Sequence, residues 1–191
     1  MTQANFMLFL KKFMNNPKQV GSISPSSRFL ARKMVQSVPW HQVRNVAELG
    51  SGTGAITSWI SSYVYPETNV FLFEKEGQMR SQLQRKYAGF ACHSDACQLT
   101  TTISRYAIDQ LDCIISGLPF FNFERNLRET LMKQIKQALK PDGHFVAFQY
   151  SLQMKTHFMK YFDIEKISFV PFNVPPAFVY VCRKRAKDGE L

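Results

Sequence analysis

Three glycines at alternate positions follow a short apolar run in the sequence Val46-Ala47-Glu48-Leu49-Gly50-Ser51-Gly52-Thr53-Gly54. A Cβ atom would obstruct both a tight turn and the approach of a ligand to the backbone, so this spacing is typical of a turn between a strand and a helix at a ligand site. Glu74 stands at the end of the next apolar run, where a carboxylate can bind both hydroxyls of a ribose. The glycines and Glu74 therefore predict an α/β fold with a cofactor site at the strand ends.

From residue 44 onward, short apolar runs alternate with longer segments of helical periodicity, which indicates a mostly parallel sheet flanked by helices. We expect seven strands, at residues 45–49, 69–73, 90–93, 111–116, 144–150, 164–170 and 178–183, and helices at 55–64, 77–87 and 125–139. A turn at Pro141-Asp142-Gly143 should introduce the fifth strand. The linker between the last two strands is too short for a crossover helix, so these strands should pair antiparallel.

The first 43 residues are predicted to form a helical extension of a single domain that spans residues 44–191. Between Met1 and Ala47 the chain has seven Lys or Arg residues and no Asp or Glu. An amphipathic helix is expected around residues 5–15, where it could lie on a membrane surface or pack on the domain as a lid. Its candidates for membrane contact are Phe6, Phe9, Leu10, Phe13, Lys11 and Lys12.

A second helix is expected in the extension, with Ser24 as its cap and Pro25 at its first position. The helical spacing predicts an inward-facing side made of Phe29, Leu30, Met34 and Val35.

The composition excludes several classes of protein. Of the 191 residues, 45% are hydrophobic and 17 are Phe, which is typical of a folded globular protein and not of a disordered chain. No stretch approaches the roughly 18 apolar residues of a membrane-spanning helix, and no secretory signal is visible, so a cytoplasmic location is expected. The net charge of +10 favours a polyanionic partner, either nucleic acid or an anionic lipid surface. The cysteines lack a zinc spacing, so no metal is expected.

The motif Glu48-x-Gly50-x-Gly52-x-Gly54, with Glu74 after the second strand, resembles that of the class I S-adenosylmethionine-dependent methyltransferases. The resemblance covers about residues 44–185 and implies their Rossmann-like fold, S-adenosylmethionine as cofactor and S-adenosylhomocysteine as product. It implies that the glycine turn, with Ser51, holds the methionine part of the cofactor, that Glu74 holds the ribose and that Asp95 lies beside the adenine. Two alternatives need no cofactor. The glycines could mark only a strand-to-helix turn, and Asp95 could be an ordinary loop residue, because Asp is common in loops.

The fourth predicted strand ends in Ser116-Gly117-Leu118-Pro119-Phe120-Phe121, at the sheet edge where α/β folds bind substrates. Methyltransferases that act on exocyclic adenine nitrogens have Asn or Asp at the position of Gly117, and its absence disfavours adenine as acceptor. Together with the run from Pro17 to Ala31 and with Pro175-Pro176-Ala177, this element resembles the bacterial phospholipid N-methyltransferases, relatives of the ribosomal RNA adenine dimethylases. That resemblance implies methylation of the amine of phosphatidylethanolamine at the inner face of the membrane, where anionic lipids attract basic side chains.

Tyr150 and Phe120 are the predicted catalytic residues, because both would line the acceptor pocket at the strand ends. The Tyr150 hydroxyl could hydrogen-bond the amine, although a core tyrosine with a satisfied hydroxyl is an equal alternative. Ser116 and Gly117 are further candidates for cofactor binding, and the candidates for substrate binding are Gly21, Ser22, Leu118, Pro119 and Phe121. Two other functions stay open: an RNA adenine N6-methyltransferase whose basic residues bind phosphates, and a protein that binds S-adenosylmethionine without catalysis.

Overall fold

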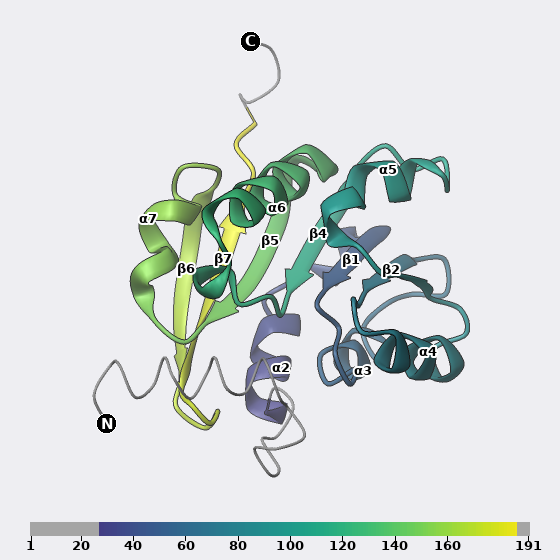
Figure 1. Ribbon diagram of the computed structural model, residues 1–191, viewed down its shortest axis with the longest axis horizontal. Helices are drawn as coiled ribbons and strands as arrows, with labels where there is room; N and C mark the ends of the chain where they lie inside the picture. Colours follow the sequence, from purple (N-terminus) through teal and green to yellow (C-terminus); the bar gives the residue numbers. More distant parts are fainter. Residues whose placement is uncertain (1–26, 187–191) are drawn as a thin grey trace.

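A seven-stranded sheet organises the computed structural model of the chain, which describes residues 27–186 (Figure 1). The strands are β1 (Asn45–Leu49), β2 (Asn69–Phe73), β3 (Ala91–His93), β4 (Leu111–Ser116), β5 (Leu139–Gln149), β6 (Asp163–Val170) and β7 (Ala177–Arg183). They lie in the order β3-β2-β1-β4-β5-β7-β6. The strands from β1 to β5 pair parallel, whereas β7 runs antiparallel between β5 and β6. The predicted fold, a mostly parallel sheet with an antiparallel last strand, is confirmed.

Helices cover both faces of the sheet. The α-helices are α2 (Arg28–Val35), α3 (Thr57–Ile60), α4 (Gly77–Lys86), α5 (Leu99–Ser104), α6 (Arg125–Ala138) and α7 (Lys155–Phe158). Short 3-10 helices are η1 (Trp40–Gln42), η2 (Ala96–Gln98), η3 (Phe120–Asn122) and η4 (Leu152–Met154). One hydrophobic cluster lies between the sheet and α2, α3 and α4, and a second lies between the sheet and α5, α6 and α7. The domain therefore has three layers.

Alternate residues of the central strands point to the two faces of the sheet. In β1, Val46 belongs to the cluster beneath α2, whereas Ala47 and Leu49 belong to the cluster beneath α6. A strand that is buried on both faces is a nearly continuous apolar run. For this reason β1, β2 and β4 have their predicted bounds.

Helix α2 packs its apolar side on the sheet beside the β6–β7 hairpin. The fully buried residues on this side include Leu30, Met34 and Val35, as predicted. The inward orientation predicted for Phe29 is wrong: this side chain is 45% exposed and contacts Phe172, with ring centroids 5.4 Å apart. The cap of α2 is Ser27, whose hydroxyl accepts the N–H of Leu30. The predicted cap, Ser24, lies outside the described residues.

Among the elements predicted from residue 44 onward, two differ from their predicted bounds by more than one residue. Helix α3 covers four residues of the predicted 55–64, because backbone bonds that follow it, such as that from Ser62 N–H to Trp59 O, span three residues instead of four. Strand β5 begins at Leu139 instead of residue 144, so the predicted turn at residues 141–143 is part of an irregular strand. Asp142 has a φ of +60° there, and the pairing with β4 shifts register.

Within residues 27–186, no helix combines the length and the apolar composition that crossing a membrane requires.

Candidate active site

The glycine turn, residues 50–54, leads from β1 towards α3 and hydrogen-bonds the end of β2. The N–H groups of Gly50 and Ser51 both donate to the carbonyl of Phe73, at 2.8 and 3.1 Å. Gly50 has a φ of +75°, in the left-handed region, and a Cβ atom there would lie 2.8 Å from Cδ2 of Leu118. The backbone conformation therefore favours glycine at this position, and a larger residue would also displace the side chain of Leu118.

Two backbone amides hold the carboxylate of Glu74 at the end of β2. The N–H of Gly52 donates to Oε2 at 2.7 Å, and the N–H of Glu76 donates to Oε1 at 2.8 Å. Each carboxylate oxygen has a second lone pair to which a ribose hydroxyl could donate. A hydrogen bond thus joins the glycine turn directly to Glu74, and the sequence predicts both as parts of one cofactor site.

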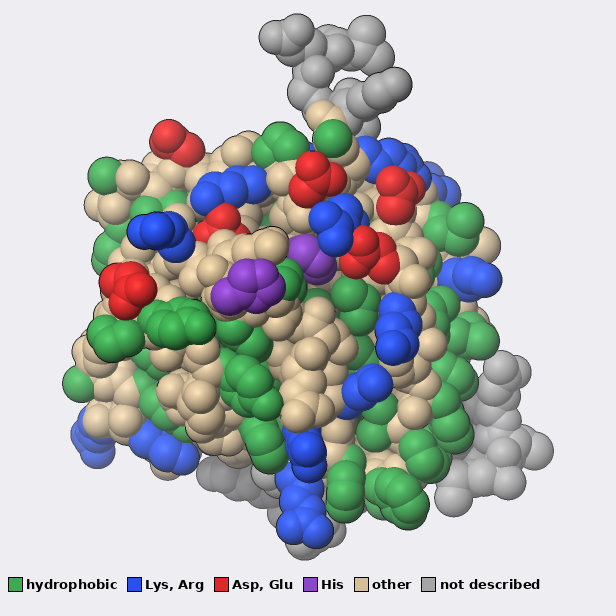
Figure 2. All heavy atoms as spheres, turned by 180° about the vertical axis from the view of Figure 1, so that it is seen from behind, with side chains coloured by type: hydrophobic (Ala, Val, Ile, Leu, Met, Phe, Trp, Pro, Cys, Tyr) green, Lys and Arg blue, Asp and Glu red, His purple; other side chains and the backbone are tan. Residues whose placement is uncertain are grey.

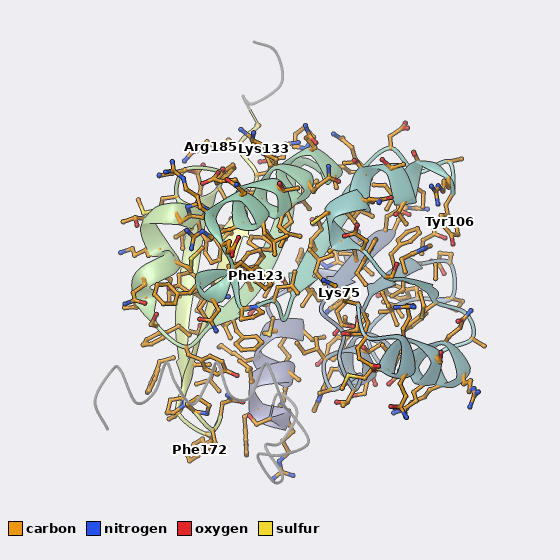
Figure 3. All side chains as sticks on the ribbon, viewed as in Figure 1. Lys75, Tyr106, Phe123, Lys133, Phe172 and Arg185 are labelled. Atoms are coloured by element: carbon orange, nitrogen blue, oxygen red, sulfur yellow. The ribbon has the colours of Figure 1, made fainter. Side chains whose placement is uncertain are left out.

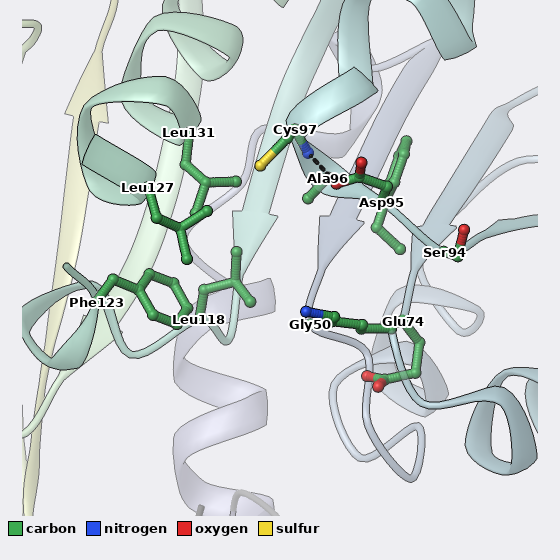
Figure 4. A pocket seen from close by; sticks show the side chains of 12 residues that line it. Gly50, Glu74, Ser94, Asp95, Ala96, Cys97, Leu118, Phe123, Leu127 and Leu131 are labelled. Carbon is green, nitrogen blue, oxygen red and sulfur yellow. Dashed lines mark hydrogen bonds between the residues drawn. The ribbon is translucent and has the colours of Figure 1, made fainter. Parts of the chain in front are cut away.

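A cavity of about 450 Å³ lies at the carboxyl ends of the parallel strands (Figure 4). Its volume is within the range of roughly 300–1,000 Å³ that is usual for small-molecule sites. Four residues predicted to bind cofactor or substrate line it together: Gly50, Glu74, Asp95 and Leu118. Figure 4 shows Glu74 and Asp95 on one side of the cavity and Leu118 on the other. These four residues therefore lie around one space in the structure.

Asp95 follows β3 and begins η2. Its Oδ1 atom accepts the N–H of Cys97 at 2.9 Å, and its side chain is exposed at the cavity wall. Asp95 therefore lies where it could contact a ligand in the cavity, and its role beside an adenine stays a prediction. Within residues 27–186, no three His, Cys, Asp or Glu side chains are grouped so that they could hold a metal ion.

Glu48 is fully buried between the glycine turn and α3. Its Oε2 atom accepts the hydroxyl of Thr57 at 2.6 Å, whereas Oε1 has no hydrogen-bond partner. The buried hydroxyl of Ser51 has no hydrogen bond of good geometry either, although it lies close enough to Glu48 to lower the pKa of that carboxyl. Burial raises the pKa of Glu48 from 4.5 to about 8. Unpartnered polar atoms beneath a glycine turn fit a cofactor that brings its own ammonium group, as S-adenosylmethionine does.

The raised pKa of Glu48 predicts that ligand-free protein loses stability as pH rises. The Glu48 carboxyl ionises near pH 4.5 in the unfolded chain but keeps its proton up to about pH 8 in the folded protein, so its own contribution to stability is greatest below pH 4.5 and is lost between these values. A Glu48→Gln variant has no such proton. We expect its melting temperature, relative to wild type, to rise by roughly 10 °C between the two ends of this range.

Thermal unfolding at several pH values, without cofactor, measures this difference. Glu67→Gln is the matched control, because Glu67 is exposed on the surface and should leave the pH profile unchanged. Parallel profiles for wild type and Glu48→Gln would show that the buried carboxyl does not hold its proton.

Residues 116–121, which we call the acceptor loop, are fixed to β1 and to each other. The N–H of Gly117 donates to the carbonyl of Leu49 at 2.8 Å. The buried hydroxyl of Ser116 accepts the N–H of Leu118 at 3.2 Å. Pro119 then leads into η3. The loop thereby holds Leu118 against the glycine turn.

Gln149, at the end of β5, holds the acceptor loop from the other side. Its Nε2 atom donates to the carbonyl of Leu118 at 3.0 Å, and its Oε1 atom accepts the N–H of Phe121 at 3.4 Å. Gln149 is 4% exposed. A glutamine at the end of an otherwise apolar strand is the one sequence signal for this role, and the sequence analysis does not include Gln149 among the site residues.

The two residues predicted to line the acceptor pocket lie on opposite faces of the sheet. Tyr150 is half-buried with the cluster beneath α2, where its ring contacts Phe148 edge to face. Phe120 is fully buried in the cluster beneath α6, among rings that include Phe145 and Phe158. The structure therefore does not bring Tyr150 and Phe120 together, and Phe120 has no surface to offer a substrate.

Several cavity residues carry no recognisable sequence signal. Apolar side chains of the α6 region form one wall, namely Phe123, Leu127 and Leu131. Their spacing is that of any helix that packs on a sheet. The predicted substrate residues Gly21 and Ser22 lie outside the described residues, as do the predicted membrane contacts Phe6, Phe9, Leu10, Phe13, Lys11 and Lys12.

Comparison with protein families matches residues 46–143 to the family described as a methyltransferase domain. Among curated proteins, the ornithine lipid N-methyltransferase of Singulisphaera acidiphila is 34% identical over 184 residues, which cover 94% of this chain and 96% of that protein.

Solved methyltransferases share the fold. The N-methyltransferase NodS from Bradyrhizobium japonicum WM9, in complex with S-adenosylhomocysteine, has a TM-score of 0.66 at 12% identity, over 88% of this chain and 92% of that one. A TehB-like S-adenosylmethionine-dependent methyltransferase from Corynebacterium glutamicum has a TM-score of 0.58 at 16% identity, over 96% of this chain and all of that one (100%).

Proposed function

The chain belongs to the class I S-adenosylmethionine-dependent methyltransferases, with S-adenosylmethionine as cofactor and S-adenosylhomocysteine as product, and from this we propose that it methylates the amine of a membrane lipid. Phosphatidylethanolamine is the first candidate acceptor, from the sequence motifs of the acceptor loop. An ornithine lipid is the second, from the curated relative. Both are amphiphiles with an amine in the headgroup, so one site chemistry serves either.

One observation carries this proposal: the chain is 34% identical to a lipid N-methyltransferase along nearly the whole of both proteins. A likeness that extends over 94% of the chain includes the acceptor side as well as the cofactor side. The acceptor class is therefore better supported than by a match to the cofactor motif alone.

The geometry at Gly117 argues against adenine as acceptor. A Cβ atom at this position would lie 3.0 Å from the carbonyl oxygen of Gly50 and 3.8 Å from Cδ1 of Ile56. An Asn or Asp that binds an exocyclic amino group would require the glycine turn to shift by roughly a few tenths of an ångström. The acceptor loop is therefore built without the side chain that adenine recognition would use.

Cofactor binding draws on the residues around the cavity. We assign the ribose to Glu74, the adenine to the cavity beside Asp95, and the methionine part to Glu48 and the glycine turn. The buried unpaired oxygen of Glu48 is the group that most clearly requires a partner.

S-adenosylmethionine supplies a methyl group on a sulfonium, which an uncharged amine nitrogen attacks as the carbon–sulfur bond breaks. The amine first releases a proton to solvent. We assign Tyr150 to hold that nitrogen, because it stands at the carboxyl end of β5 on the face that carries α2. Burial raises the pKa of Tyr150 above its usual 10, so its hydroxyl stays protonated at neutral pH and serves as a hydrogen-bonding group. An aromatic ring also attracts the methylated cation that forms.

The protein would work at the membrane surface as a peripheral enzyme on the cytoplasmic side. Its net charge of +10 suits anionic lipids. The sequence offers a second attraction in the amphipathic helix that is predicted near the N-terminus.

Transfer of labelled methyl from S-adenosylmethionine tests the proposal. The acceptors are vesicles with phosphatidylethanolamine, vesicles with an ornithine lipid, and unmodified ribosomal RNA, followed by separation of lipid from nucleic acid. We expect label in at least one lipid and none in RNA. Label in RNA alone would assign the chain to adenine methylation, and cofactor binding without transfer to any of the three would favour a non-catalytic protein.

A further inference from the structure

The antiparallel arrangement of β7 places the tip of the β6–β7 hairpin at the reactive edge of the sheet. Gln149, which ends β5, lies opposite Phe178 near the start of β7. At the other side of the hairpin, Val170 pairs with Ala177. Residues 171–176, which we call the tip, therefore project beyond the carboxyl ends of the parallel strands, on the side that carries the acceptor loop (Figure 1).

The tip exposes large apolar side chains that pack on no buried core. Phe172 is 71% exposed and Val174 is 80% exposed. Phe172 contacts the exposed Phe29 at the start of α2, so the apolar surface continues from the tip onto the helix. Single exposed apolar residues are common, but a contiguous group on one edge marks an interaction site.

Hydrogen bonds fix the shape of the tip. Asn173, between the two exposed residues, is 3% exposed. Its Oδ1 atom accepts the N–H of Ser27 at 2.9 Å, and its Nδ2 atom donates to the carbonyl of Pro175 at 2.7 Å. Pro171, Pro175 and Pro176 restrict the backbone further. A buried asparagine thus locks the tip to α2, and Phe172 and Val174 are held outward by an ordered turn.

Two arginines of α2 lie beside this apolar surface, and the segments that form it contain no acidic residue. Residues 27–43 and 166–178 contain no Asp or Glu. Helix α2 exposes Arg28 and Arg32, and the guanidinium of Arg28 lies 5.0 Å from the ring centre of Phe29. In Figure 2, the lower part of the face shows Lys, Arg and apolar side chains, and the Asp and Glu side chains lie higher.

We propose that the tip and the exposed side of α2 form a docking surface for an anionic lipid bilayer, with Phe172 and Val174 inserted among the lipids and Arg28 and Arg32 at the headgroups. Aromatic and aliphatic side chains bordered by arginines are the pattern of proteins that lie in a membrane interface. A folded protein partner would be expected to bring acidic side chains to the arginines. Nucleic acid would contact the arginines through its phosphates and would not require the apolar side chains of the tip. The inference rests on the proposed function, because a lipid acceptor must be reached from this edge.

The test is sedimentation of the full chain with phosphatidylcholine vesicles, with and without phosphatidylglycerol. Apolar side chains that enter the bilayer are removed from water, which stabilises binding, so we expect the Phe172→Ser/Val174→Ser variant to bind the anionic vesicles at least about tenfold more weakly. Tyr65→Ser is the matched control: Tyr65 is 50% exposed but lies in the turn before β2, at the opposite edge of the sheet.

A charge variant completes the test. Arg32→Gln should weaken binding to vesicles with phosphatidylglycerol and leave binding to pure phosphatidylcholine unchanged. Lys133→Gln is its control, because Lys133 is exposed on α6, far from the tip, as Figure 3 shows for the labelled Phe172 and Lys133.

Methyl transfer separates this inference from the proposed function. In the Phe172→Ser/Val174→Ser variant, transfer to vesicle lipid should fall, while transfer to a short-chain, monomeric form of the same aminolipid should match wild type. Unchanged vesicle binding in this variant overturns the docking surface and leaves lipid methylation standing. The docking surface is also overturned if Arg32→Gln weakens vesicle binding but the Phe172→Ser/Val174→Ser variant does not, because binding would then be purely electrostatic. Failure of wild type to methylate any lipid overturns the proposed function, whereas sedimentation still decides the docking surface.

Discussion

A Gly50→Ala variant is expected to bind the cofactor and its product about tenfold more weakly. The added Cβ atom would lie 2.8 Å from Cδ2 of Leu118, and the backbone at this residue has a φ of +75°. The left-handed conformation alone costs about 1–2 kcal/mol for an alanine. Relief of the clash must move either the glycine turn or Leu118, and both belong to the cofactor cavity. Calorimetric titration with S-adenosylhomocysteine measures the loss.

Two further glycines separate the causes of this effect. Gly52→Ala adds a Cβ atom at a φ of +54° with no atom within 4 Å, so it tests the backbone strain without the clash and should weaken binding less. Gly89 has neither a positive φ nor a neighbour within 4 Å, and Gly89→Ala should bind as wild type does. Equal affinity of the Gly50 and Gly89 variants would refute the assigned role of the turn.

A Gln149→Leu variant is expected to reduce methyl transfer by about tenfold to a hundredfold. Leucine has a similar size but leaves the carbonyl of Leu118 without its donor and the N–H of Phe121 without its acceptor. Unsatisfied buried groups cost about 1–3 kcal/mol each, so the acceptor loop should shift to find new partners. Because Glu48, Glu74 and the glycine turn remain in place, transfer should fall more than cofactor affinity does.

Initial rates at saturating cofactor, together with calorimetry, resolve the two effects. Gln153→Leu is the control, because Gln153 is an exposed residue of η4 that makes no bond to the acceptor loop. A Gln149→Leu enzyme with full transfer activity would mean that the loop holds its position without β5.

Strands are easier to predict from this sequence than helices. The buried strands are marked by their own apolar residues, whereas some helices depend on contacts with distant parts of the chain. The residues of β4, such as Ile114 and Ile115, are buried on both faces, so a run of branched apolar residues identifies the strand by itself. Helix α5 has no such signal. Its run from Thr100 to Thr102 has low helix propensity, and the backbone and hydroxyl of Thr100 are instead held by Gln134 of α6 at 3.0 Å. That contact exists only in the folded protein.

The cofactor side of the site follows from the sequence because its residues are adjacent to strand ends. Gly50 and Glu74 occupy fixed offsets from β1 and β2, and parallel strands bring those offsets to one edge. The acceptor side is less predictable, because it depends on which face of the sheet each side chain packs against. Phe120 and Tyr150 both stand near strand ends, but the turn at η3 directs Phe120 into the cluster beneath α6. Tertiary packing, and not the local sequence, determines this direction.

The reversed direction of β7 has a kinetic consequence. A parallel last strand would put its preceding loop at the amino edge, away from the acceptor loop, whereas the observed hairpin turns at the same edge. An enzyme that rests on a bilayer by that edge meets new acceptors by lateral diffusion and need not dissociate between turnovers. The proposed residence on one vesicle, compared with the interval between turnovers, would then decide how many headgroups of that vesicle are methylated in one visit.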